Sequence, residues 1–362
     1  MRPRARDLGV AFAGVPGPLN AITDVPGVTV GYATIVRGEG PLVVGHGPVR
    51  TGVTAIHPRG LGSHAPALAG WCPLNGNGEL TGTTWIAESG FLEGPVMLTN
   101  THSVGVVSAA VLAWQARTGR LCQPYSYPVV GETYDGRLND INGFHVTAEH
   151  TLAALEGATG GAIAEGNVGG GTGMICFGFK GGTGTASRRV AIAGAGIYSL
   201  GVLVQANFGT RDQLVIAGVP LARELAGPPP AAAAAEQGSI IVVIATDAPL
   251  LSHQLERVAR RAGLGIGRTG GIGGNGSGDI MLAFSTANPD AATADPIARL
   301  EALANSRIDP VFAATIEATE EAIVNALVAA ETMTGIGGLV VPALPHDRLR
   351  EAMDRHRRRA SN

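Results

Sequence analysis

The stretch Gly238–Leu250, GSIIVVIATDAPL, decides the fold, and it follows directly on a Pro/Ala-rich segment, GPPPAAAAAEQ. Its run Ile240–Ile244 is entirely apolar and β-branched, which is typical of a strand buried on both faces. The linker Gly227–Gly238 can bury little and is expected to lie exposed. Because so apolar a strand needs cover on both sides, we expect it to insert into a sheet shared with the preceding chain, so that residues 1–362 fold as a single domain.

The composition allows a large core and argues against two classes of partner. Of the 362 residues 45% are apolar and 15% charged, and 54 are glycine, so packing must rest on aliphatic side chains and closely approaching backbones. The net charge of −3 and the pI near 6.3 offer no basis for binding nucleic acid or an anionic membrane surface.

Cysteine usage and the apolar segments favour a cytoplasmic protein. Cys72, Cys122 and Cys176 are far apart and odd in number, which indicates neither a disulfide framework nor a zinc knuckle. The first 21 residues resemble a signal peptide, but Asp7 and two prolines interrupt the apolar part. The uncharged run Val190–Thr210 contains polar residues and glycines, so we interpret it as two buried strands joined at Tyr198–Gly201, and not as a membrane span.

Hydrophobic periodicity predicts a mixture of strands and helices. The strands are expected at Val28–Ala33, Val53–Ile56, Val96–Leu98, Met174–Phe179, Val190–Ile197, Val202–Ala206, Ile240–Ala245 and Ile280–Ser285. The helices are expected at Val104–Arg117, His145–Leu155, Leu250–Arg261 (with Asp247 and Pro249 as its start signal), Val311–Thr332 and Asp347–Arg359. Strands dominate early and helices late, which predicts sheets sandwiched by helices and not a regular βαβ array.

Several common catalytic motifs are missing from the sequence. The Gly-x-Gly-x-x-Gly patterns beginning at Gly265 and Gly271 follow a helix, which is the wrong context for a dinucleotide loop. Lys180 is the only lysine, so there is no Walker motif and a single candidate for Schiff-base or Ser-Lys chemistry. No Gly-x-Ser-x-Gly elbow occurs, and the nine histidines form no ligand pattern. We therefore expect neither a metal nor a cofactor.

The Gly238-Ser239 junction suggests a peptide bond that is cut. Glycine tolerates close backbone approach, and the Ser239 hydroxyl could attack the Gly238 carbonyl by an N-to-O shift. Cleavage would free an α-amine with an ordinary pKa of about 8, which is a suitable base near neutrality. An ordinary serine at a loop-to-strand boundary remains the alternative on this stretch alone.

Two other segments supply groups that such chemistry needs. Asn207, at the end of a buried strand, is a candidate donor to an oxyanion. Ser277 and Asp279 are two residues apart at the entry to a strand, where an extended backbone would point both side chains the same way. A turn with polar strand-start residues is the competing interpretation of this second segment.

The chain also resembles the DmpA-type aminopeptidases, a family that includes L-aminopeptidase/D-amidase-esterases and β-peptidyl aminopeptidases. The resemblance runs over nearly the whole length and is carried by NAITDVPGVTVGY (20–32), VVGETYDGRLNDINGFHV (129–146), EGNVGGGTGMICFGFKGGTGTASR (165–188), GVLVQANFG (201–209), GSIIVVIATDAPL (238–250) and NGSGDIMLAFSTAN (275–288).

The resemblance implies a fold and a set of site residues. The fold would be a four-layer αββα sandwich, similar to the N-terminal nucleophile hydrolases but connected differently, in a chain cut into α (1–238) and β (239–362) parts that form a homo-oligomer. The residues implied are the nucleophile Ser239, the oxyanion donor Asn207, the orienting pair Ser277 and Asp279, the active-site tyrosine Tyr134, and Glu132 to bind the substrate's free amine. Some family members carry Glu where this chain has Asp279.

The sequence as a whole predicts a self-processing serine aminopeptidase or amidase acting on short peptides, amino-acid amides or esters. A carboxylate such as Glu132 is suited to a cationic N-terminus, and an acyl-enzyme on Ser239 requires no metal. Two alternatives stay open: an amidase of the same fold acting on non-peptide amides, and an uncleaved, non-catalytic binding or scaffold protein.

Overall fold

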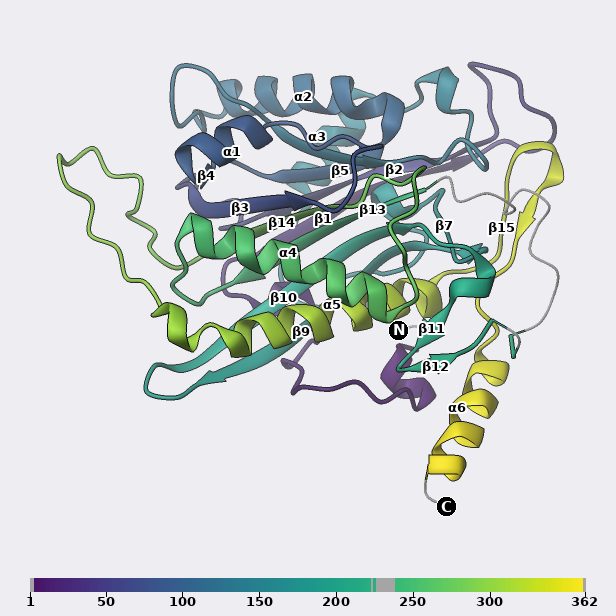
Figure 1. The fold of residues 1–362 in the computed structure, drawn as a ribbon. Coiled ribbons are helices and arrows are strands. Elements are labelled where there is room, and N and C mark those ends of the chain that lie inside the picture. The colour runs from purple at the N-terminus through teal and green to yellow at the C-terminus, as the bar shows by residue number, and fades with distance from the viewer. Residues whose placement is uncertain (1–2, 223, 226–237, 361–362) are drawn as a thin grey trace.

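The computed structural model describes residues 3–222, 224–225 and 238–360, and the expected linker Gly227–Gly238 lies outside them except for Gly238. Two β-sheets lie face to face between two layers of helices (Figure 1). Helices α2 (Val104–Arg117) and α3 (Ala148–Glu156) cover one sheet, and α4 (Ser252–Arg268) and α5 (Asp309–Ala329) cover the other. This arrangement confirms the predicted four-layer αββα sandwich.

The first sheet has four strands in the order β1-β2-β5-β6. Their bounds are Thr29–Arg37, Val49–His57, Val96–Asn100 and Val129–Thr133. β1, β2 and β5 pair antiparallel, whereas β5 and β6 are parallel and are connected by α2. The ends of β5 and β6 therefore lie at the same edge of this sheet.

The second sheet has six strands in the order β4-β3-β14-β13-β10-β9. Their bounds are Phe91–Leu92, Ala67–Pro73, Ile280–Ser285, Ser239–Thr246, Gly196–Asn207 and Gly182–Ile192. β13 pairs antiparallel with β10 and parallel with β14, so strands from before and after residues 227–237 share one sheet. The parallel pair requires a crossover, which α4 provides.

The remaining elements are short or peripheral. They are α1 (Thr83–Ser89), α6 (His346–Ala360) and three two-residue strand pairs: β7 (Ile175–Cys176) with β8 (Phe179–Lys180), β11 (Val215–Ile216) with β12 (Val219–Pro220), and β15 (Met333–Thr334) with β16 (Val340–Val341).

Strand alternation divides the core between the layers. On β13 the side chains of Ile241, Val243 and Ala245 belong to the core between the two sheets. Ile240, Val242 and Ile244 point the other way, into the core under α4 and α5. The complete burial of this strand on both faces explains why its sequence shows no polar alternation.

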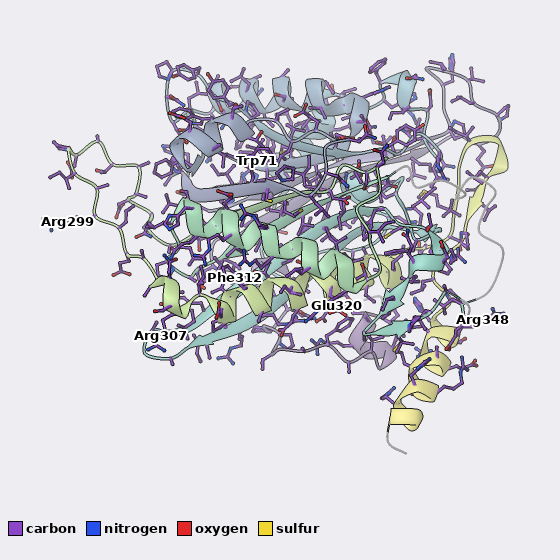
Figure 2. The ribbon with its side chains drawn as sticks, viewed as in Figure 1. Trp71, Arg299, Arg307, Phe312, Glu320 and Arg348 are labelled. Atoms are coloured by element: carbon purple, nitrogen blue, oxygen red, sulfur yellow. The ribbon has the colours of Figure 1, made fainter. Side chains whose placement is uncertain are left out.

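α4 and α5 pack closely because of a glycine and a set of cation–π contacts. A Cβ on Gly265 would lie 2.8 Å from the Ile316 carbonyl oxygen, so only glycine allows this approach. The guanidinium carbons of Arg257 and Arg261 lie 5.2 Å and 4.0 Å from the ring centre of Phe312, which Figure 2 labels. The first glycine pattern of the sequence thus serves helix packing.

Three local predictions were wrong. The expected strand Met174–Phe179 is the tight hairpin β7–β8. The uncharged run Val190–Thr210 does hold two strands, but the turn lies between Ile192 and Gly196, and Tyr198–Gly201 is inside β10. The Asp247 signal does not start α4, which begins at Ser252, because the Asp247 carboxylate accepts a hydrogen bond from the Ser199 amide at 2.6 Å.

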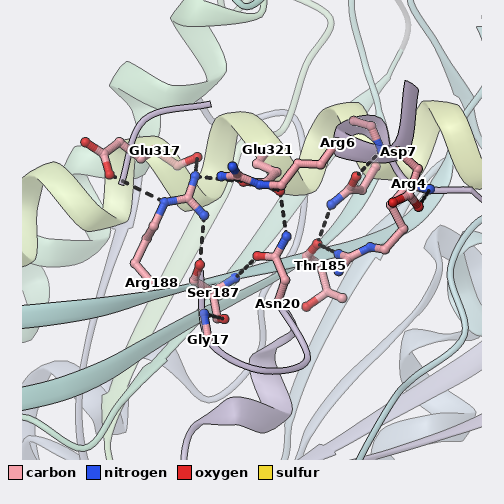
Figure 3. A network of polar contacts seen from close by, with 12 residues as sticks. Arg4, Arg6, Asp7, Gly17, Asn20, Thr185, Ser187, Arg188, Glu317 and Glu321 are labelled. Atoms are coloured by element: carbon pink, nitrogen blue, oxygen red, sulfur yellow. Dashed lines mark hydrogen bonds and ion pairs between the residues drawn. The ribbon is translucent and has the colours of Figure 1, made fainter. Parts of the chain in front are cut away.

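The N-terminal segment is fastened to α5 and β9 by a buried polar network (Figure 3). The Glu321 carboxylate bonds Arg6 at 2.7 Å, Arg188 at 2.8 Å and the Asn20 amide at 2.6 Å. Burial opposes ionisation of Glu321, but the hydrogen bond from Arg6 and the charge of Arg188 outweigh it and lower the pKa of Glu321. Glu321 is therefore one of two carboxylates that hold the segment; the other, Glu165, pairs with Arg4 at 2.8 Å.

Within the part of the chain that the structure describes, no helix combines the length and apolar character that crossing a bilayer requires.

We predict that Glu321→Ala destabilises the fold by about 3–5 kcal/mol, because the buried guanidinium of Arg188 loses its closer carboxylate and keeps only Glu317 at 3.4 Å. The free energy of unfolding in urea measures this loss. Glu256→Ala is the control: its ion pair with Arg260 is about half exposed, so its loss should cost ~0–1 kcal/mol. Equal losses in the two variants would contradict the prediction.

Candidate active site

The site lies where the ends of both sheets meet. In the second sheet the first residue of β13, Ser239, pairs with the last residue of β10, Asn207. In the first sheet β6 ends at Thr133, and the next residue, Tyr134, accepts a hydrogen bond from the Asn207 side chain through its carbonyl oxygen. The sheets thus bring together segments far apart in the sequence.

The Ser239 hydroxyl is buried and held by backbone. The residue is 4% exposed, and its Oγ accepts a hydrogen bond of 3.0 Å from the Gly278 amide. Ser239 lies two residues before Ile241 on β13, so both side chains are on the same face of the strand. The Ser239 side chain therefore points between the sheets. An interior serine at the start of a rigid strand is well placed to act on the peptide bond that precedes it.

Gly238 passes so close to Asn207 that no side chain fits there. A Cβ on Gly238 would overlap the carbonyl oxygen of Asn207 and would lie 3.3 Å from its Nδ2 atom. Glycine is therefore required at this position for steric reasons. The same contact places the side-chain amide of Asn207 beside the Gly238-Ser239 peptide.

The Asn207 amide is held at both ends. Its Oδ1 accepts a hydrogen bond of 2.7 Å from the Ile175 amide, and its Nδ2 donates one of 2.9 Å to the Tyr134 carbonyl. An amide nitrogen carries two hydrogens, so a second donor remains on Nδ2. A second N–H of the fixed Asn207 amide is thus available next to Gly238.

The pair Ser277 and Asp279 forms the third side of the site. The Ser277 hydroxyl donates to the Asp279 carboxylate at 2.6 Å, in agreement with the expectation that both side chains point the same way. The same carboxylate oxygen accepts a longer hydrogen bond of 3.3 Å from the Ile240 amide. A carboxylate therefore lies next to the first peptide unit of β13.

Asn75 is a site residue that the sequence interpretation missed. Its side chain accepts from the Asp279 amide at 2.5 Å and donates to the Asp279 carboxylate at 3.1 Å. The residues after it pack against the loop that precedes β14, since a Cβ on Gly78 would lie 2.9 Å from the Gly278 Cα. The turn-forming sequence Asn75-Gly76-Asn77-Gly78 was the available signal, but it does not reveal its partner.

Glu132 lies on β6 close to this loop. It is 3% exposed and accepts hydrogen bonds from the Glu79 amide at 3.0 Å and from the Thr101 hydroxyl. Burial raises the pKa of Glu132, and these two hydrogen bonds oppose the rise. A Cβ on Gly78 would lie 3.4 Å from Glu132 Oε1 and 2.9 Å from the Gly278 Cα. Gly78 is therefore packed between the Glu132 carboxylate and Gly278.

Tyr134 reaches the site through its backbone. Its carbonyl holds Asn207, whereas its hydroxyl lies against Gly136, where a Cβ would be 2.5 Å from it. The side chain is 39% exposed, so it borders the site from the solvent side. That Tyr134 takes part in the active site stays a prediction.

The assembled groups are a buried hydroxyl beside a peptide carbonyl, an oriented amide donor, and two buried carboxylates. Such a set is suited to acyl transfer with a serine nucleophile. Among residues 3–222, 224–225 and 238–360, no three His, Cys, Asp or Glu side chains gather in a way that could hold a metal ion.

Comparison of sequences places this chain next to peptidases. The model of "Peptidase family S58" matches residues 20–341. The chain is 55% identical over 373 residues to "Beta-peptidyl aminopeptidase BapA" of Sphingosinicella microcystinivorans, covering 99% of this chain and 94% of that protein. It is 49% identical over 371 residues to the protein of the same name from Sphingosinicella xenopeptidilytica, with coverages of 97% and 91%.

Solved structures agree with the sequence comparison. The L-aminopeptidase D-Ala-esterase/amidase of Ochrobactrum anthropi, described as a prototype for the serine aminopeptidases and a new variant among the Ntn hydrolase fold, superposes with a TM-score of 0.91 at 49% identity, covering 99% of each chain. The β-aminopeptidase of a Burkholderia species superposes with a TM-score of 0.89 at 47% identity, covering 98% of this chain and 99% of that one.

Proposed function

The chain belongs to peptidase family S58, and from this premise we propose that Ser239 is the nucleophile of a self-processing serine aminopeptidase. The family and the relatives named above make the protein a peptidase with an aminopeptidase/amidase function, on a variant of the Ntn hydrolase fold, as the sequence resemblance implied. The proposal concerns the residues that perform the reaction, the maturation step and the substrates.

The observation that carries the proposal is the position of Ser239. Ser239 is the first residue of β13, and its hydroxyl is buried. It directly follows Gly238, whose backbone lies against Asn207. In maturation, Ser239 Oγ attacks the Gly238 carbonyl carbon, the carbon–nitrogen bond breaks, and the hydroxyl proton moves to the departing nitrogen. Water then hydrolyses the resulting ester, which leaves a carboxylate on Gly238 and an α-amine on Ser239.

The freed amine serves as the general base in peptide hydrolysis. With an ordinary pKa of about 8, it can take the Ser239 hydroxyl proton as Oγ attacks the substrate carbonyl. The second N–H of Asn207 stabilises the oxyanion, and the proton passes to the leaving amine. Water then attacks the acyl ester while the Ser239 amine takes a proton from the water. The bond between the acyl carbon and Oγ breaks, and the proton returns to Oγ. Asp279 lies one peptide unit away and favours the protonated amine between steps.

Glu132 is proposed to bind the free amine of the substrate. Its carboxylate is buried near Gly278, whose amide binds the nucleophile, so an ammonium held by Glu132 would place the adjacent carbonyl near Ser239. The substrates proposed are short peptides, amino-acid amides and esters. N-terminal β-amino acids are included, since two relatives are β-peptidyl aminopeptidases.

The processed α (1–238) and β (239–362) chains are proposed to remain one co-folded αβ protomer and to assemble as a homo-oligomer in the cytoplasm. A contiguous exposed apolar run supports self-association: Leu42, Val43 and Val44 are 45%, 51% and 58% exposed. Sedimentation of the processed protein tests this, because a mass equal to one αβ protomer would exclude the assembly.

Ser239→Ala is expected to stay a single chain and to be inactive, because no hydroxyl remains to attack Gly238. The mass of the denatured protein reports the outcome at residue accuracy: wild-type protein should give two chains divided after Gly238. Ser277→Ala, with the nucleophile intact, serves as the comparison and should still be cut, though more slowly. A Ser239→Ala variant divided at the same bond would refute the assignment.

Glu132→Gln is expected to raise KM for free-amine substrates about 10-fold or more, because it removes the charge that pairs with the ammonium. A panel of α- and β-amino-acid p-nitroanilides measures this against N-blocked analogues, which wild-type enzyme should not hydrolyse. Because the pKa of Glu132 is raised, the same increase in KM should begin in the wild type as pH falls through that raised value. Equal rates on blocked and free substrates would instead support an amidase of the same fold.

A further inference from the structure

In the sequence, Lys180 is a candidate for amine chemistry that the proposed function leaves unused. It is the only lysine in the chain, and its side chain is fully buried. It lies on β8, directly opposite Ile175 of β7. An amine in the interior is costly unless its hydrogens are bonded, so its partners indicate why it is there.

All three hydrogens of the ammonium are directed at backbone carbonyls. Nζ donates to the oxygens of Met174 at 2.8 Å, Gly181 at 2.9 Å and Gly171 at 3.4 Å. These carbonyls belong to the β7–β8 hairpin and to the glycine-rich segment before it. Lys180 therefore binds backbone carbonyls only. Of the three, the Met174 carbonyl is the one that connects Lys180 to the candidate active site.

The Met174 carbonyl and the Ile175 amide belong to the same peptide unit. That amide donates to Asn207 Oδ1 at 2.7 Å. A continuous chain thus runs from the Lys180 ammonium through one peptide to the side chain proposed as the oxyanion donor. A cation at the carbonyl end polarises the peptide and strengthens the hydrogen bond that its N–H makes.

We propose that Lys180 is a positioning residue for Asn207: by holding the Met174–Ile175 peptide it fixes which end of the Asn207 amide faces the Gly238-Ser239 bond. The inference rests on the proposed role of Asn207 as the oxyanion donor. Without the fixed Ile175 amide, only the Tyr134 carbonyl holds the Asn207 amide, so the side chain is freer to rotate and present Oδ1, an acceptor, where a donor is needed. The oxyanion would then meet a lone pair in place of an N–H.

Burial works against the charge of Lys180. It lowers the pKa of Lys180 to about 7, and the nearby Asp135 opposes that fall. Asp135 is itself buried, beside the Asn139 amide at 3.0 Å, and burial raises its pKa to about 7. The protein thus keeps an amine in a position where charge is expensive, which a merely structural core residue such as Met or Leu would avoid.

A double-mutant cycle tests the inference. Lys180→Met keeps the length of the side chain and removes Nζ; it is made in the wild type and in Asn207→Ala. The readouts are the self-cleavage rate of the precursor and kcat and KM per processed chain on an amino-acid p-nitroanilide. We expect Asn207→Ala to lower kcat by ~10²–10³-fold. Lys180→Met alone should lower both rates at least about 10-fold with little change in KM, and should add no further loss to Asn207→Ala.

Arg211→Met is the matched control. Arg211 is also a buried cation on carbonyls of this hairpin, but it bonds Phe177 at 3.0 Å and Gly178 and not the Met174–Ile175 peptide. Arg211→Met should reduce the stability of the protein. Any factor by which it changes kcat should be the same in the wild type and in Asn207→Ala. If Lys180→Met does not accumulate in folded form, Lys180→Gln takes its place in the cycle, since it keeps an N–H donor but no charge.

The outcomes separate the two proposals. A wild-type rate in Asn207→Ala would overturn the oxyanion assignment and the inference together. Suppose instead that Asn207→Ala lowers kcat, and that adding Lys180→Met lowers kcat further by the same factor as it does in the wild type. That result would overturn the inference alone. An unchanged kcat in Lys180→Met would do the same. If Lys180→Met lowers kcat only in protein that still contains Asn207, the result supports Lys180 as the positioning residue.

Discussion

The site depends on the close approach of the Gly238 backbone to Asn207 at the end of the central sheet. β13 pairs with β10 from Ser239 onward and with β14 from Ile241 onward, and the Ser239 hydroxyl accepts from the Gly278 amide, so the first residue of the strand is held in place. Because Gly238 carries no Cβ, the peptide before Ser239 can lie against the Asn207 amide. The apolar strand therefore does more than fill the core: its rigidity sets the distance between the Ser239 hydroxyl, the Gly238-Ser239 peptide bond and the amide proposed as the oxyanion donor.

The polar groups of the site are supported by burial in an otherwise apolar sandwich. Between the sheets the effective dielectric is low, so each fixed hydrogen bond acts more strongly than it would in water. Asp279 is held by Asn75, and Asn207 by Ile175 and Tyr134, before any substrate arrives. A site of this kind needs little reorganisation as charge develops, which is the property that oxyanion stabilisation requires.

Several features could be predicted from the sequence because their signals are local. The burial of β13 follows from its uninterrupted β-branched run, and α2 was predicted with its observed bounds from periodicity alone. Ser277 and Asp279 are two residues apart, so their mutual contact depends mainly on the backbone between them. The Asp247 start signal failed because a β10 amide, 48 residues away in the chain, binds that carboxylate.

The sequence by itself indicated the candidate residues for the chemistry and determined which strand is central, since residue type and apolar pattern are properties of short segments. Only the tertiary structure decided how those residues are held. Asn75 meets Asp279 across 204 residues, Tyr134 meets Asn207 across 73 and contributes its carbonyl, and the single lysine reaches Asn207 through an intervening peptide. Such contacts arise where two sheets end side by side, and no spacing within one segment encodes which carbonyl or amide will lie within hydrogen-bonding distance.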